Sequence, residues 1–91
     1  MNQKHNYKEL FKLARELRDC LKVKGNAKEV KELNALLDGY WSTTSEVLGD
    51  FMITFKNIRY NVNSLSEEYK KRLDNTIGQI EIAFDRANNP E

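Results

Sequence analysis

Residues 30–62 read VKELNALLDGYWSTTSEVLGDFMITFKNIRYNV. Successive residues of an α-helix are about 100° apart, and at that spacing the apolar and aromatic side chains of this stretch fall in one sector together with Thr44. The sector holds Val30, Leu33, Leu36, Leu37, Tyr40, Trp41, Thr44, Val47, Leu48, Phe51, Met52, Phe55, Ile58 and Val62. A stripe that keeps one phase over this distance predicts a single long helix, roughly 50 Å from end to end.

Short capping patterns predict where the helices begin and end. An Asn or Ser followed three residues later by Glu can satisfy unpaired backbone N–H groups at a helix start. The pattern occurs at Asn6 with Glu9, Asn26 with Glu29 and Ser64 with Glu67. Gly25 suits a helix C-cap, because glycine accepts the left-handed conformation required there. We therefore expect helices over 7–24, 27–61 and 65–88.

A competing start signal lies inside the long stripe. Thr43 and Glu46 form a capping box within the polar run of residues 42–45. Read this way, the chain is a four-helix bundle with a break near Ser42–Thr43. A turn usually changes the direction of the apolar face, whereas this stripe points the same way on both sides. The phase therefore favours three helices with a long middle one, and the four-helix bundle is the alternative.

The predicted fold is all-α, an antiparallel helical bundle in a single domain over 1–91, with 1–5 and 89–91 frayed. The only proline is Pro90, and the four glycines leave few helix breakers. Short connections would fold the first and last helices back onto opposite halves of the long middle helix. Each end of that helix would then have one neighbour, so we expect a homodimer that covers both ends.

The composition argues against several functional classes. The 15 basic and 14 acidic side chains nearly balance, which gives no overall attraction to nucleic acid or to a membrane surface. No window approaches the roughly 18 apolar residues of a membrane span. The first residues carry no signal-peptide pattern, and Cys20 is the only cysteine, so we expect a cytoplasmic protein. We find no catalytic, cofactor or metal motif, and we predict that the chain is not an enzyme.

Charge alternates in blocks along the chain. Residues 1–31 sum to +5, 32–53 to −4, 54–72 to +3 and 73–91 to −3. This order favours antiparallel neighbours, because a basic block then lies beside an acidic one. Exposed pairs are individually weak, so they act mainly on register and partner choice.

Two functional hypotheses follow. The leading one is a helical interaction protein that self-associates and binds a protein partner. Its interface residues are Tyr40, Trp41, Phe51, Phe55 and Ile58 on the stripe, with Ile53 and Tyr60 on a second surface where Gly49 would let another helix approach. The alternative is a nucleic-acid-binding accessory protein that uses one basic side of the first helix, made of Lys8, Lys12, Arg15 and Lys22.

Overall fold

The computed structural model describes the backbone of residues 3–88 and the side chains of residues 7–86. Over that part of the chain every regular element is an α-helix. The helices are α1 (Gln3–Lys24), α2 (Ala27–Leu37), α3 (Thr44–Asn61) and α4 (Glu67–Asn88). The all-α class is therefore confirmed. Of the frayed ends predicted for 1–5 and 89–91, residues 1–2 and 89–91 lie outside the described residues, whereas residues 3–5 belong to α1.

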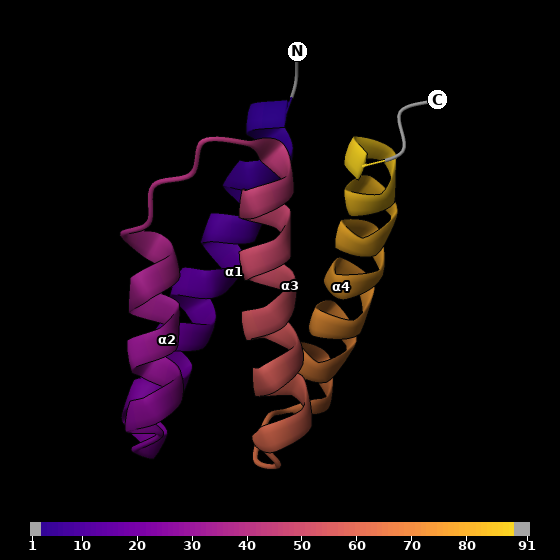
Figure 1. The fold of residues 1–91 in the computed structure, drawn as a ribbon. Helices are drawn as coiled ribbons and strands as arrows, with labels where there is room; N and C mark the ends of the chain where they lie inside the picture. The colour runs from indigo at the N-terminus through magenta and orange to yellow at the C-terminus, as the bar shows by residue number, and fades with distance from the viewer. Residues whose placement is uncertain (1–2, 89–91) are drawn as a thin grey trace. The chain divides into compact units, whose positions relative to one another are not determined.

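The chain divides into two compact units, Met1–Tyr40 and Trp41–Glu91. The first unit contains α1 and α2, and the second contains α3 and α4. Within each unit the two helices lie side by side and run antiparallel (Figure 1). Each unit is thus a helical hairpin.

The predicted long helix over 27–61 is wrong, because the chain leaves the helical conformation between Leu37 and Thr44. Thr43 is in the extended conformation, and its hydroxyl oxygen accepts a hydrogen bond from the Glu46 N–H at 3.2 Å. The Glu46 carboxylate in turn accepts from the Ser42 N–H at 2.9 Å. This pair supplies partners for backbone N–H groups at the start of α3, which makes a new helix start favourable here. The described residues therefore form four helices, as the alternative four-helix prediction had it.

The phase of the stripe misled because the intervening segment is irregular. Residues 38–43 separate two helices, so the apolar face of each can turn toward its own neighbour without reference to the other. A shared direction across such a segment is compatible with one helix or with two. Asp, Gly, Ser and Thr are also poor helix formers, and this segment is rich in them.

In the first unit, the turn between α1 and α2 is a glycine cap. Gly25 has φ of +82°, its N–H donates to the Lys22 carbonyl at 3.2 Å, and the Asn26 N–H donates to the Leu21 carbonyl at 3.0 Å. This is the Schellman arrangement, and it confirms the C-cap predicted at Gly25. Helix α1 begins at Gln3, so the start signal predicted at Asn6 is wrong. The buried residues of this unit are Leu10, Leu13, Ala14, Leu17, Leu21, Leu33 and Leu36.

In the second unit, α4 begins later than the sequence predicted. Ser66, not Ser64, caps the helix: its hydroxyl oxygen accepts from the Tyr69 N–H at 3.2 Å and its carbonyl from the Lys70 N–H at 3.0 Å. Leu65 is buried just before this cap. The other buried residues of the unit are Val47, Leu48, Phe51, Phe55, Ile58, Val62, Leu73, Ile77 and Ile80.

Two ion pairs cross between α3 and α4. Lys56 Nζ lies 3.0 Å from a Glu81 carboxylate oxygen. Arg59 donates to both carboxylate oxygens of Asp74, from Nε at 2.8 Å and from a terminal nitrogen at 3.2 Å, and this bonding raises the pKa of Arg59. The antiparallel pairing predicted from the basic block 54–72 and the acidic block 73–91 is confirmed by these contacts.

The cap at Thr43 is tested by Thr43→Ala. Loss of an N-cap hydroxyl costs about 1 kcal/mol, which corresponds to a fall in Tm of about 4–8 °C for a small domain. The matched control is Ser42→Ala, because Ser42 uses its backbone N–H and keeps it. Thermal unfolding followed by circular dichroism would measure both variants. Equal Tm values for the two variants would contradict the assigned cap.

The irregular segment is tested by limited chymotrypsin digestion. Tyr40 is 99% exposed in this segment, whereas Tyr60 is 74% exposed but lies within α3. Proteases cut exposed irregular backbone in preference to helix. We expect the first cut after Tyr40, giving fragments 1–40 and 41–91 by mass spectrometry. Early cleavage after Tyr60 would show that exposure of the side chain alone controls the reaction.

Candidate functional site

Three of the predicted interface residues are internal. Phe51, Phe55 and Ile58 have no exposed surface, and the two phenylalanine rings pack edge to face with centroids 5.5 Å apart. These three side chains are therefore covered within the single chain, and their assignment to an interface stays a prediction. Complete burial is also what a hydrophobic core requires of the apolar face of a helix.

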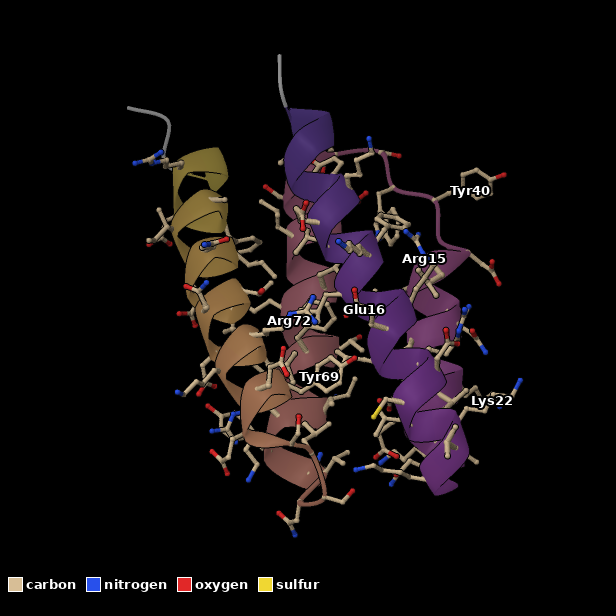
Figure 2. The ribbon with its side chains drawn as sticks, turned by 180° about the vertical axis from the view of Figure 1, so that it is seen from behind. Arg15, Glu16, Lys22, Tyr40, Tyr69 and Arg72 are labelled. Atoms are coloured by element: carbon tan, nitrogen blue, oxygen red, sulfur yellow. The ribbon has the colours of Figure 1, made fainter. Side chains whose placement is uncertain are left out.

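Trp41 and Tyr40 are neighbours in sequence with different surroundings. Trp41 is half-buried: its ring lies 6.0 Å from that of Phe51, and its indole N–H donates to the Asp50 carboxylate at 2.7 Å. This bond ties the end of the irregular segment to α3. Tyr40 has no such cover, and Figure 2 shows its side chain projecting away from the ribbon.

The sequence suggested that Gly49 shares an outward surface with Ile53 and Tyr60, but the structure places Gly49 elsewhere. A Cβ atom built at Gly49 would lie 3.5 Å from the Phe84 ring, so this glycine faces α4 of the same chain. The helix that approaches Gly49 is therefore an internal neighbour. This corrects the row to Ile53 and Tyr60 alone.

Those two residues lie on the side of α3 opposite its core. At about 100° per residue, Ile53 and Tyr60 are within about 20° of each other and point away from Phe51 and Ile58. Lys56 and Arg59, which bond to α4, lie between the two sides. Ile53 and Tyr60 are 59% and 74% exposed.

Helix α4 contributes to the same side of the hairpin. Ile82 is 58% exposed and, with Gly78, points away from the buried Leu73, Ile77 and Ile80. Asp74 and Glu81, which bond to α3, again lie between the two sides. Around each helix axis, the core residues, the ion-paired residues and the exposed residues follow one another in the same rotational order. Because the two helices are antiparallel, this shared order places both exposed rows on one surface of the hairpin. We call the surface made by Ile53, Tyr60, Gly78 and Ile82 the outer face.

The sequence analysis did not assign Gly78 or Ile82 to a surface, and it missed the Trp41–Asp50 hydrogen bond. A signal for the α4 row was present, because Gly78 and Ile82 are four residues apart on the polar side of an amphipathic helix. No pattern in the sequence shows that this row and the α3 row share a surface.

The basic residues predicted on the first helix are accessible. Lys8, Lys12, Arg15 and Lys22 are all exposed on α1, and Figure 2 shows Arg15 and Lys22 projecting from it. Asp19 lies within this row, and its carboxylate accepts from the Arg18 Nε at 3.1 Å. Arg18 thus offsets the one acidic charge inside the row.

A shallow pocket of about 310 Å³ lies beside the turn between α1 and α2. Its lining offers amine and amide groups on an apolar floor, with no carboxylate or thiol. The lining residues are Lys22, Gly25, Asn26, Ala27, Val30, Lys31 and Asn34. These groups do not form a catalytic acid–base pair or a metal site.

Within the side chains described, no three His, Cys, Asp or Glu residues come together as metal ligands would. None of the helices in the described part of the chain has the length and apolar character to cross a membrane.

Comparisons with protein-family models, with curated proteins and with solved structures gave no match to this chain. The candidate function therefore rests on the surface of the molecule itself.

Proposed function

We propose that this chain is a non-enzymatic helical protein that acts by binding protein, a second copy of itself included, through the outer face of the α3–α4 hairpin. A cytoplasmic location is part of the proposal, since a single cysteine cannot form an internal disulfide and suits a reducing compartment.

The exposed apolar side chains of the outer face carry the proposal. Isolated apolar residues on a surface are ordinary, but a group of them on one face is typical of a contact site. Ile53, Tyr60 and Ile82 form such a group on two helices that ion pairs hold together. The rigid backbone of the hairpin would present them without a large ordering cost on binding.

The carboxylates near this face support a binding role over a catalytic one. The Glu46 carboxylate accepts a hydrogen bond from the Ser42 N–H, and the Asp50 carboxylate accepts one from the Trp41 indole N–H. Asp74 forms an ion pair with Arg59, and Glu81 forms one with Lys56. These groups have structural partners that fix helix ends and register. A general acid or base would instead need access to a substrate proton.

The proposal is tested by the double variant Ile53→Asp/Tyr60→Asp. Burying two carboxylates at the centre of an apolar contact costs desolvation free energy. We therefore expect the Kd of any complex to rise at least about tenfold, as for the loss of a hot-spot residue. The readouts are self-association by analytical ultracentrifugation and retention of proteins from cell extract on the immobilised chain.

The matched control is Val23→Asp/Tyr40→Asp. It removes one aliphatic and one aromatic side chain that are at least as exposed, and it adds the same charge at residues that do not belong to the outer face. Circular dichroism would check that both variants keep their helices. If the two double variants bind alike, or if the wild-type chain binds no protein at all, the proposal is wrong.

A second candidate is nucleic-acid binding by the basic row of α1, which is favoured by the exposure of Lys8, Lys12, Arg15 and Lys22 and by the pairing of Asp19 with Arg18. We expect affinity for duplex DNA or RNA at low salt that falls steeply as salt is added, because binding releases counterions.

Lys8→Gln/Lys12→Gln/Arg15→Gln tests that candidate against Lys28→Gln/Lys31→Gln/Lys71→Gln, which removes the same charge elsewhere. Only the first variant should lose binding and reduce the salt slope, by about 0.9 for each phosphate that the chain no longer neutralises. No shift of either nucleic acid by the wild-type chain at low salt would exclude the candidate.

A further inference from the structure

We propose that the occupant of the outer face is a second copy of this chain, packed antiparallel about a two-fold axis near Gly78. The inference rests on the proposed function and specifies the partner and its register. It is carried by a glycine that the chain itself does not need, by the spacing of the apolar residues around it and by the charges at the two ends of the face.

Gly78 lies in the middle of α4, where glycine weakens a helix relative to alanine. Its backbone is not in the left-handed region, and a Cβ atom built there meets nothing within 4 Å. Packing within the described chain therefore does not require glycine at this position. A missing side chain on an exposed helix face permits close approach by another backbone, as glycine does at helix crossings.

The apolar residues are arranged on both sides of Gly78. The ion pairs Lys56–Glu81 and Arg59–Asp74 set the register and bring Gly78 level with Asn57. At 1.5 Å per residue, Ile53 and Ile82 both lie about 6 Å to one side of this level, and Tyr60 lies about 5 Å to the other. In a two-fold contact, groups at equal distances on opposite sides of the axis meet. The isoleucine pair of each copy would then pack on the tyrosine of the other.

The charges at the ends of the face favour the same orientation. Asp50 and Asp85 lie about 10 Å from the level of Gly78 at the isoleucine end, and Lys71 lies about 10 Å from it at the tyrosine end. Asp50 also accepts the Trp41 indole N–H at 2.7 Å, Lys56 pairs with Glu81 at 3.0 Å and Lys70 pairs with Glu67 at 3.5 Å. Arg86 and Glu68 are the further exposed charges of α4 near these ends, and they lie farther around the helix from Gly78 and Ile82 than Asp85 and Lys71 do. An antiparallel copy brings acid to base at both ends, whereas a parallel copy would bring acid to acid.

Sedimentation equilibrium over a wide concentration range is the first experiment. We expect the wild-type mass to rise from 10.7 kDa toward twice that value. Ile82→Asp should raise the dimer Kd at least about tenfold, with Val23→Asp as the control that leaves it unchanged. Both positions are exposed, and circular dichroism would verify the fold of each variant.

Gly78→Ala separates a dimer role from a structural one. A methyl group there has open space within the chain and improves the helix, so Tm measured at a concentration where the chain is monomeric should rise. The same methyl group would hold the second copy away and raise the dimer Kd. A higher Tm with an unchanged Kd would overturn the proposed axis.

A charge exchange tests the antiparallel register. Lys71→Glu should weaken the dimer, and adding Asp85→Lys to that variant should restore it. The two positions lie 14 residues apart on α4, about 21 Å, so their charges cannot pair within one chain. Recovery in the double variant therefore reports a contact between copies, and failure to recover overturns this register.

A wild-type chain that stays monomeric at every concentration would overturn the second copy as the occupant. The proposed function would survive that result if Ile53→Asp/Tyr60→Asp still abolished retention of another protein. A dimer that is indifferent to Ile82→Asp and Gly78→Ala would also overturn the inference, because it would form through a different surface.

Discussion

The cap at the start of α3 is the constraint on which the rest of the structure depends. Thr43 and Glu46 satisfy backbone groups that a helix start leaves unpaired, and they do so in the middle of a stripe that could otherwise have continued as one helix. Once α3 starts there, residues 38–43 become a connection, and the chain forms two short hairpins in place of one long helix with two flanking helices.

This change alters which residues are available for recognition. In a long exposed helix, the aromatic stripe would have needed a second copy to cover its ends. In the α3–α4 hairpin, Phe51, Phe55 and Ile58 are covered within the chain. The exposed apolar side chains of this hairpin lie on its opposite side, and their pattern depends on the register between α3 and α4. Exposed ion pairs add little stability, but Lys56–Glu81 and Arg59–Asp74 define that register.

Local chemistry explains which predictions from sequence succeeded. The all-helical class follows from the low content of glycine and proline, and the glycine cap at Gly25 follows from a conformation that other residues resist. The charge blocks predicted the pairing of α3 with α4, because opposite charges of successive segments meet when the chain folds back. Local patterns did not distinguish Ser64 from Ser66 as the α4 cap, which the structure places at Ser66, directly after the buried Leu65.

The sequence by itself determined the helical class, the polarity of each helix face and the presence of two competing starts near residue 43. Tertiary structure decided between those starts and decided what faces what. Gly49 faces Phe84, while Gly78 faces open space. The physical reason is that a helical pattern specifies direction around one axis only. Whether a glycine admits an internal neighbour, or Ile53 and Ile82 share a surface, depends on how two helices are rotated and staggered against each other.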